Sequence, residues 1–426
     1  MTDAPNPEVK TDKKPLVIIF FTVFIYLLGF GIVIPTIPII STQLGATAFQ
    51  AGLLMSAYSF MQFIFSPFWG RLSDRHGRRP ILLICLAGEV FAYLLFSQAT
   101  NLPLLFVARL LSGFFGASIS TASAYISDIT PPHERSKGMA LIGVAFGLGF
   151  LFGPAIGGGL TLWAEHISPD PFFRSSFSSY WVAGLCLLTF LFAFRYLKET
   201  NTKISVAAEK KNRFSRILHH FRIETIGPLM FVFFLSSFAM SCMEATLVLY
   251  AKDRFGWGLK EVSFGFAYIG VIIVLTQGFL VRRLIPKVGE KQVLRAGLIF
   301  MVIGFSTIAI ANSIPVLAIA QTFLAVGVGF TNPSILGAIS LLTSDDEQGT
   351  TLGTTQGLSS LGRIIGPALG GALYSALTLT SPFVFSSALM MIALFIVITI
   401  YSDIPNAGQI LKTNLKETSQ DKKNTK

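Results

Sequence analysis

Three charged residues lie inside long apolar runs of this chain, and their types and positions could support proton chemistry. Glu89 and Arg109 lie in the consecutive runs 80–98 and 102–127, and Glu244 lies in the run 225–250. A charge at the centre of a membrane-spanning helix costs about 2.5–3.5 kcal/mol, so such residues mark ion, proton or ligand pathways. Desolvation favours the protonated form of a carboxyl, whereas a nearby cation favours the charged form. We therefore expect Glu89 to exchange a proton and Arg109 to tune that exchange.

Each of these charges also has a structural interpretation. Glu89 and Arg109 could form an ion pair that only ties two helices together. Glu244 lies toward one end of its run. It is a second candidate for proton coupling, and it could equally be a cation-attracting site or an interfacial acid. The sequence leaves these alternatives open.

The composition indicates what kind of scaffold positions these charges. Of the 426 residues, 52% are hydrophobic and 13% are charged, and the mean hydropathy is +0.65. Soluble domains carry about 25% charged residues, which excludes a soluble enzyme or a DNA-binding protein. The three cysteines lie in apolar runs and the five histidines lie in or near polar connections, so we expect no disulfide framework and no metal site. The sequence contains no Walker motif, so we expect no cofactor, and a proton gradient as the energy source.

Apolar runs of membrane-spanning length predict twelve helices. They cover roughly 16–39, 47–69, 80–98, 102–127, 137–163, 178–197, 225–250, 261–284, 292–311, 314–342, 350–377 and 381–402. A basic interruption at 198–224 divides them into two sets of six. The sequence thus predicts an all-α integral membrane protein with a tail at 1–15, a first half at 16–197, a solvated linker at 198–224, a second half at 225–402 and a tail at 403–426.

The basic residues predict the orientation of these helices. Of the 33 lysines and arginines, only Arg174, Lys252, Arg254 and Lys260 fall in loops on the side opposite the termini. Cytoplasmic loops carry an excess of Lys and Arg, so we expect both termini in the cytoplasm. The net charge of +11 is explained by this asymmetry, and no nucleic-acid partner is expected.

The two predicted halves share a glycine–proline string, G-x-x-x-G-P-x-x-G-G-x-L. The first copy contains Gly149, Gly153, Pro154, Gly157 and Gly158, and the second contains Gly362, Arg363, Gly366, Pro367, Gly370 and Gly371. A repeat at half the chain length indicates a duplication, and parallel six-helix repeats are one way to build a transporter. Small residues on one face allow close helix contact, so the strings could also serve packing alone.

Several motifs resemble the major facilitator superfamily. The loop 70–79 reads GRLSDRHGRR and matches the superfamily signature G-x-x-x-D-R-x-G-R-R, and the first glycine–proline string resembles the antiporter signature of its drug:proton antiporters. The stretch from Arg109 to Thr130 is similar to the tetracycline efflux proteins. This resemblance implies the major facilitator fold, with twelve helices in two pseudo-symmetric halves that alternate access to a central cavity.

The resemblance also implies roles for single residues. Arg109 matches the arginine implicated in proton coupling in this family, although the usual glutamine three residues later is Ser112 here. The cytoplasmic gate would be formed by Gly70, Asp74, Arg75, Gly77, Arg78 and Asp128, with Arg78 paired to Asp128 as a latch that breaks when the halves rock. A tight, positively charged topology anchor is the alternative interpretation of this loop.

The expected cavity between the halves is mainly apolar and aromatic. Its candidate lining residues are Tyr26, Phe30, Tyr58, Gln62, Met243, Tyr268, Gln277 and Gln321. Aromatic residues and methionine accommodate varied ligands. Four polar positions of the tetracycline exporters fall here at Tyr26, Ala92, Ile273 and Met301, which disfavours tetracycline as the substrate.

Together these features predict a proton-coupled exporter of hydrophobic or amphipathic small molecules. A dedicated exporter or importer of one metabolite or siderophore is the alternative. A receptor built on a degenerate transporter fold would be expected to lose the buried charges, which persist here. The resemblance implies a bacterial inner membrane as the location, and we expect a monomer.

Overall fold

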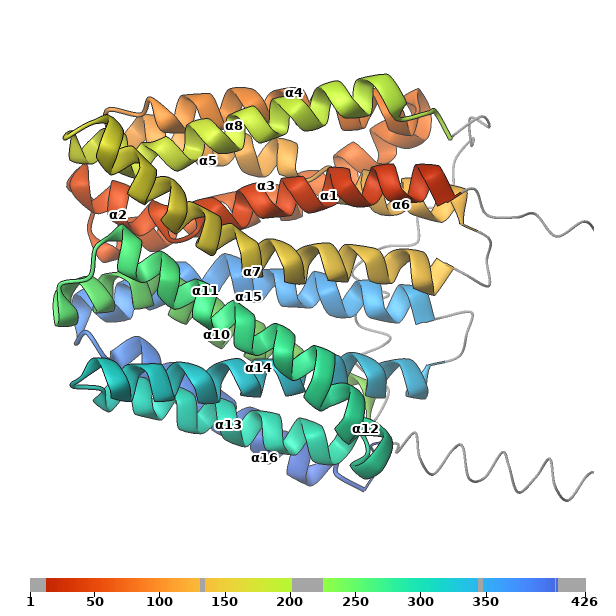
Figure 1. Cartoon of the computed structure of the whole chain (residues 1–426). Coiled ribbons are helices and arrows are strands. Elements are labelled where there is room, and N and C mark those ends of the chain that lie inside the picture. The colour runs from red at the N-terminus through yellow and green to blue at the C-terminus, as the bar shows by residue number, and fades with distance from the viewer. Residues whose placement is uncertain (1–12, 131–134, 201–224, 344–347, 403, 405–426) are drawn as a thin grey trace, which may run out of the picture.

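The computed structural model describes residues 13–130, 135–200, 225–343, 348–402 and 404, and the regular structure in these ranges is helical (Figure 1). The helices before the linker are α1 (Lys13–Val33), α2 (Thr36–Gln43), α3 (Ala48–His76), α4 (Arg78–Ser97), α5 (Leu102–Gly116), α6 (Ile119–Ile129), α7 (Arg135–Ile167) and α8 (Pro171–Tyr196). Those after it are α10 (Ile226–Phe255), α11 (Leu259–Leu275), the π-helical segment η2 (Thr276–Val281), α12 (Arg282–Val288), α13 (Glu290–Ile310), α14 (Ile314–Leu342), α15 (Gln348–Ala376) and α16 (Ser381–Thr399).

Three of the predicted runs are interrupted in the structure. The run 16–39 divides into α1 and α2 at Pro35, which has no backbone N–H to continue the helix. The run 102–127 divides into α5 and α6 at residues 117–118, and the run 261–284 changes to π-helical geometry at η2. Such irregular turns inside membrane helices are common at functional sites.

Many of the helices are long enough to cross a membrane. In the described part of the chain, ten helical segments are long and apolar enough to cross a membrane. α7 and α15 contain 33 and 29 residues. With them, the described ranges hold twelve long helical segments, the number that the apolar runs predict. The fold class is therefore an all-α, multi-pass membrane protein.

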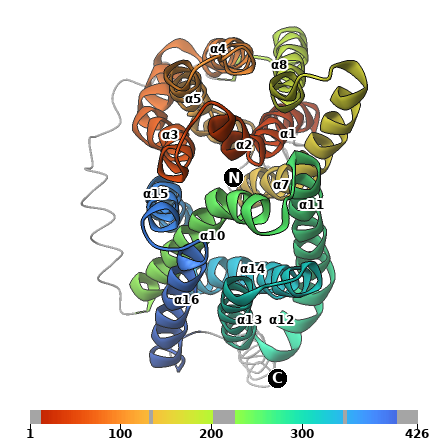
Figure 2. The same ribbon diagram turned by 90° about the vertical axis from the view of Figure 1, so that its left-hand side faces the viewer.

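The helices form two groups (Figures 1 and 2). α1 to α8 lie together on one side and α10 to α16 on the other. The start of α1 and the end of α16 lie at the same end of the molecule, which we term the terminal end. Most of the predicted tails and linker lie outside the described residues, so these predictions stay untested, although α1 already begins at Lys13 within the predicted first tail.

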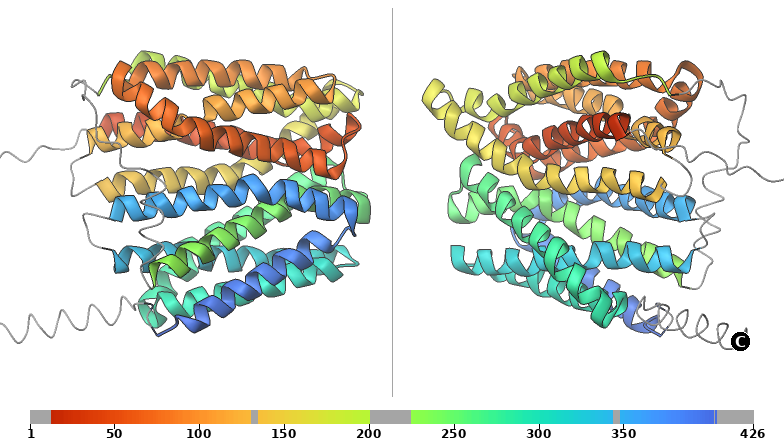
Figure 3. Two further views of the ribbon diagram at one scale, coloured as in Figure 1. Left: turned by 180° about the vertical axis from the view of Figure 1, so that it is seen from behind. Right: turned by 45° about the vertical axis from the view of Figure 1, so that its right-hand side comes forward.

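Two helix pairs provide most of the contact between the groups. α3 packs against α15, which is visible in the left view of Figure 3, and α7 packs against α11, which is visible in the right view. The contacts are close enough to require glycine. A Cβ on Gly158 would lie 2.9 Å from Ser263 Cβ, and one on Gly371 would lie 2.9 Å from Phe49 Cα. The backbone N–H of Ala368 donates to Ser56 Oγ at 3.2 Å, across the same α3–α15 contact.

The two glycine–proline strings use their other glycines within their own group. Added Cβ atoms on Gly149 and Gly153 would lie 2.8 and 2.6 Å from backbone carbons of α1. Added Cβ atoms on Gly362 and Gly366 would lie 2.8 and 2.9 Å from backbone atoms of Phe238 in α10. Both strings therefore set the approach of one helix to the first helix of its own group, while their last glycine faces the other group.

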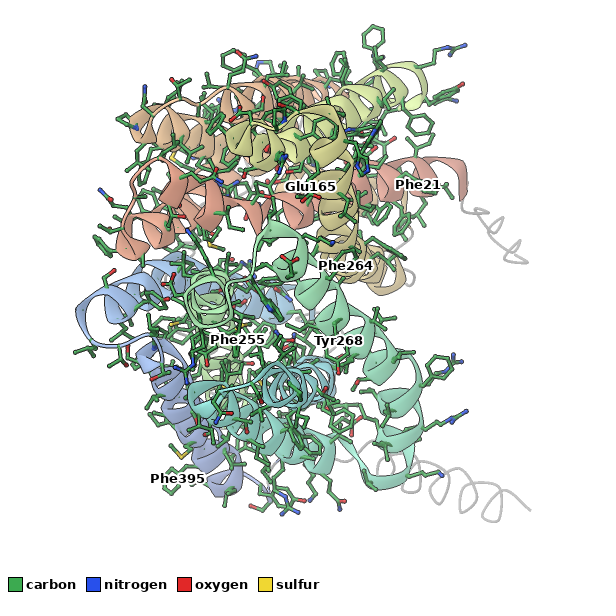
Figure 4. The ribbon with its side chains drawn as sticks, turned by 60° about the vertical axis from the view of Figure 1, so that its left-hand side comes forward. Phe21, Glu165, Phe255, Phe264, Tyr268 and Phe395 are labelled. Atoms are coloured by element: carbon green, nitrogen blue, oxygen red, sulfur yellow. The ribbon has the colours of Figure 1, made fainter. Side chains whose placement is uncertain are left out.

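The outside of the bundle is apolar. Phe21, Phe264 and Phe395 are 45%, 46% and 71% exposed and lie at the periphery, as Figure 4 shows. Large exposed apolar side chains on every long helix are what a lipid-facing surface requires, because such patches are rare on soluble monomers.

Candidate functional site

The site forms where four helices of the first group meet: Tyr26 on α1, Tyr58 on α3, Glu89 on α4 and Arg109 on α5. All four side chains are at most 5% exposed. Gly113 allows α3 and α5 to come close, because a Cβ there would lie 2.9 Å from Tyr58 Cα and from Met61 Cβ. The close helix contact brings Tyr58 to the Arg109 side chain.

The Glu89 carboxylate is held from one side only. Ser112 Oγ donates to Glu89 Oε2 at 3.0 Å. Glu89 Oε1 is buried and has no hydrogen-bond partner in the described part of the chain. A Cβ on Gly116 would lie 3.0 Å from Glu89 Oε1 and 2.9 Å from the Tyr58 hydroxyl. Glycine at position 116 thus leaves room for these oxygens to converge.

Arg109 lies over an aromatic ring instead of pairing with an acid. Its guanidinium carbon lies 4.7 Å from the centroid of the Tyr58 ring, a cation–π geometry. Its Nε and Nη1 atoms are buried and have no hydrogen-bond partner among the described residues. Within the same residues, no ion pair joins Arg109 to Glu89. The structure therefore does not contain the helix-tying Glu89–Arg109 pair considered as an alternative.

The tyrosine hydroxyls complete this cluster. The hydroxyls of Tyr26 and Tyr58 hydrogen-bond each other, and Tyr26 also donates to the Gly116 carbonyl at 3.2 Å. Gln62 Nε2 donates to the same carbonyl at 3.1 Å, and the Phe30 ring stacks on Tyr58 at 4.9 Å. The structure thus brings together four of the predicted cavity residues with both central charges. We call Tyr26, Tyr58, Glu89, Arg109 and Ser112 the first cluster.

A second cluster lies across the α10–α15 contact and consists of Glu244 and Arg363. Arg363 lies within electrostatic range of Glu244 and of Tyr58 of the first cluster, but no ion pair joins it to Glu244 among the described residues. Its guanidinium donates to Ser359 Oγ at 3.4 Å and to Ser360 Oγ at 3.2 Å. Both charged side chains are partly accessible. Glu244 therefore has a basic neighbour on α15, which sequence reasoning did not assign to it.

The four other predicted cavity residues lie in separate places. Met243 is buried in the core of the second group. Gln321 is buried and borders a small gap beside Trp257. Tyr268 on α11 hydrogen-bonds Thr322 at 2.7 Å and is 42% exposed, and Gln277 is exposed on η2.

The loop signature is organised around Arg78, the first residue of α4. Arg78 Nε contacts Asp128 Oδ2 at 3.0 Å, so the predicted pairing is confirmed. The same guanidinium pairs with Asp74 and donates to Ser73 Oγ at 2.7 Å. Gly77 turns the chain between α3 and α4 with φ of +97°, a conformation that glycine adopts without strain. Gly70 and Arg75 lie on α3, and Arg75 is exposed.

Glu199 completes this loop and was missed by sequence reasoning. Its carboxylate accepts hydrogen bonds from the backbone N–H groups of Arg78 and Arg79, at 2.8 and 3.1 Å, and so caps the start of α4. Thr200 Oγ1 donates to Asp128 Oδ2 at 3.4 Å. The beginning of the predicted solvated linker is therefore docked on the gate. An acid in a basic linker, just after the sixth run, was the available signal.

Comparison with known proteins identifies the family. The Major Facilitator Superfamily model matches residues 19–289 and 278–419. The tetracycline resistance protein of class B from Escherichia coli is 33% identical over 361 residues, which cover 82% of this chain and 85% of that protein. Multidrug resistance protein 2 from Bacillus subtilis (strain 168) is 27% identical, over 91% of this chain and 95% of that protein.

Solved structures show the same architecture. A human organic anion transporter matches with a TM-score of 0.66 at 25% identity, covering 90% of this chain and 99% of that chain. A bacterial homologue of the lysosomal transporter Spinster matches with a TM-score of 0.74 at 14% identity, covering 91% of this chain and 96% of that chain.

Proposed function

Because this chain belongs to the Major Facilitator Superfamily, we propose that it is a proton-coupled exporter of hydrophobic or amphipathic small molecules that works by alternating access. The similarity to tetracycline and multidrug resistance proteins supports export. The protein needs no cofactor in this proposal, since the proton gradient supplies the energy. It works as a monomer in a bacterial inner membrane, with both termini in the cytoplasm.

The observation that carries proton coupling is the state of Glu89. Its carboxyl is 1% exposed, it makes no ion pair with Arg109, and one of its oxygens has no hydrogen-bond partner in the described part of the chain. A buried carboxyl in such surroundings is stable when protonated. An ionised carboxylate there would attract the guanidinium of Arg109, which has two donors without a partner in the same residues.

Coupling would follow from where Arg109 rests. When Glu89 is protonated, Arg109 stays over the Tyr58 ring, as the structure has it. When Glu89 loses its proton, Coulomb attraction draws Arg109 away from Tyr58 toward the carboxylate. Tyr58 also lies within electrostatic range of Arg363 in the second group. The movement of Arg109 away from Tyr58 would therefore change the electrostatic environment of Arg363, across the interface between the groups.

The gate would respond through Arg78. Its contacts with Asp74 and Asp128 hold the ends of α3, α4 and α6 together, and the Glu199 cap holds the end of α8 to them. All these contacts are at the terminal end and lie within the first group. In the proposal they form the cytoplasmic latch that breaks and re-forms during the transport cycle.

A dedicated carrier is the second candidate, and one observation favours it. Arg109 lies over the Tyr58 ring and Arg363 lies within electrostatic range of Tyr58, and two such cations would suit an anionic metabolite. The structural similarity to a human organic anion transporter points the same way. In this case the substrate is a single organic anion, exported or imported.

The test uses the full chain in liposomes with an imposed pH gradient and an internal pH-sensitive dye. Lipophilic cations, neutral amphiphiles, tetracycline, siderophores and organic anions are added in turn. We expect substrate-dependent proton flux that is lost in Glu89→Gln and kept in the matched control Glu165→Gln, because Glu165 is exposed at the end of α7. Flux for many compounds supports a multidrug exporter, and flux for one supports a dedicated carrier. Equal flux in Glu89→Gln and wild type would refute the assignment of Glu89.

A further inference from the structure

A hollow of about 330 Å³ opens between α12, α13 and α14, on the outside of the second group. Its lining is mainly apolar and includes Leu284, Val288, Ile299 and Phe330, together with the polar residues Gln292 and Arg295. Ile299 is 39% exposed and Phe330 is 5% exposed, so the hollow runs from the surface inward. Its shape and lining suit a hydrocarbon chain, because apolar walls favour apolar ligands.

Local backbone irregularities create this hollow. The π-helical segment η2 redirects the chain after α11, and Pro286 lies inside the short helix α12. No residue of α12 is buried. Gly289 turns the chain into α13 with φ of +86°. α12 therefore lies along the surface and leaves a space between itself and α13.

The segment that lines part of the hollow is strongly basic, and its Arg295 reaches the hollow itself. Residues 282–295 contain five basic residues and one acid, Glu290, which is 5% exposed. The Nζ of Lys291 and the guanidinium carbon of Arg295 lie 4.8 and 5.3 Å from the centroid of the same ring, that of Tyr401. Neither makes an ion pair with a carboxylate among the described residues. Two like charges held at one ring form an attractive position for an anion.

We propose that this hollow binds an anionic phospholipid, with an acyl chain between α12 and α13 and the phosphate at Lys291 and Arg295. Basic pockets between membrane helices recognise anionic headgroups in this way. α12, whose residues line part of the hollow, lies at the terminal end of the molecule (Figure 1). The site lies on the outside of the second group, away from the first cluster, and serves lipid binding and not transport.

Charge excludes two other occupants. The chain beyond Ile404 carries five lysines and two acids in residues 405–426, so its positive charge opposes this basic segment. A second copy of this chain in a two-fold contact would bring the same basic surface against itself. An anionic lipid satisfies both the mainly apolar lining and the basic segment.

Native mass spectrometry of the detergent-solubilised full chain tests this site. Dioleoyl phosphatidylglycerol is titrated against dioleoyl phosphatidylcholine, which has the same chains and no net charge. We expect wild type to prefer phosphatidylglycerol and the double variant K291Q/R295Q to bind it about twenty-five-fold more weakly, since each basic group contributes roughly fivefold. The matched control K252Q/R254Q removes two exposed charges from the end of α10 and should keep the preference.

A second variant separates the acyl chain from the headgroup. A296W fills the hollow from α13 and should weaken the binding of both lipids. Without lipid, each variant should unfold at the same temperature as wild type. Glycerol 1-phosphate should not compete, because it lacks the chain. Equal binding of both lipids to wild type, an unchanged preference in K291Q/R295Q, or full competition by glycerol 1-phosphate would each overturn the proposal.

Discussion

The two charged clusters differ in how they are enclosed, although the same glycine–proline frame supports both halves. In the first cluster, Glu89 and Arg109 are 1% and 2% exposed and lie apart, one held by a serine and the other by a tyrosine ring. In the second, Glu244 and Arg363 are intermediate in exposure, and they likewise form no ion pair with each other among the described residues. The two halves thus share the way in which their helices approach one another, whereas their charged residues differ: one pair is fully buried and the other is partly accessible.

This difference assigns different work to the halves. A sealed carboxyl without an ionic partner responds strongly to protonation, because no water compensates its charge. Glu244 keeps some accessible surface, so solvent compensates part of its charge and we expect it to respond less strongly. In our account the first half carries the proton and the second half contacts the ligand. The second half responds to the protonation state of Glu89 through Tyr58.

The largest expected effect contrasts the two glutamates. Glu89→Gln should lower substrate-dependent proton flux by at least about a hundredfold, the lower range for removing a proton-transferring group. Glu244→Gln should retain most of the proton flux and weaken binding of cationic substrates instead. Flux in proteoliposomes at matched protein density measures both. The contrast fails if Glu244→Gln alone stops proton flux.

The shared frame gives the next effect. Gly153→Ala and Gly366→Ala should each destabilise the protein by about 1–3 kcal/mol, because the added methyl group would overlap backbone at less than 3.0 Å. Gly159→Ala and Gly353→Ala serve as controls, since nothing lies within 4 Å of their added Cβ atoms. Thermal unfolding in detergent compares the four. If only one of the two glycine–proline strings is needed for stability, the alanine variant in the other string will unfold at the wild-type temperature.

The capping acids should give smaller changes. Glu199→Ala removes the cap of α4, and Glu261→Ala removes the local cap of α11, where Glu261 accepts from the Gly258 N–H at 2.9 Å. Each should cost about 1 kcal/mol of stability. Only Glu199→Ala should also change the transport rate, because only that cap touches the Arg78 latch. Identical transport in the two variants would remove Glu199 from the gate.

The smallest effect concerns the serines beside the charges. Ser112→Ala removes the one hydrogen bond to Glu89 and should change proton-coupled flux roughly fivefold, the value of one buried hydrogen bond. Ser360→Ala should be nearly neutral, since water can reach Arg363 in its place. Transport assays with both variants side by side measure this, and a stronger effect at Ser360 would reverse our assignment of the sealed site.

Much of this fold could be predicted from the sequence, because membrane helices are recognised as apolar runs of about 20 residues. Glu89 and Arg109 were identifiable for the same reason, as charges in apolar runs. Their separation was not, since an ion pair and a cation–π contact need the same residue types. Tyr58 could be predicted as a cavity residue, but its contact with Arg109 depends on the close approach of α3 to α5 at Gly113.

Other features depend on contacts between residues that are far apart in the sequence, and no local pattern predicts such contacts. Glu199 caps a helix whose first residue lies 121 positions earlier, and no local pattern connects them. The hollow beside α12 arises from a π-helical segment that leaves no periodicity change in an apolar run. In contrast, the Arg78–Asp128 pairing could be predicted from the resemblance to the family, and the structure contains it.

Infrared difference spectroscopy tests the central claim most directly, and it needs no substrate. Spectra of the detergent-solubilised full chain are taken at acidic and alkaline pH, and the C=O stretch of protonated buried carboxyls is compared among wild type, Glu89→Gln and Glu244→Gln. Our account predicts a band that disappears with rising pH in wild type and Glu244→Gln and is absent from Glu89→Gln. The same band in Glu89→Gln as in wild type would show that Glu89 does not hold the exchangeable proton.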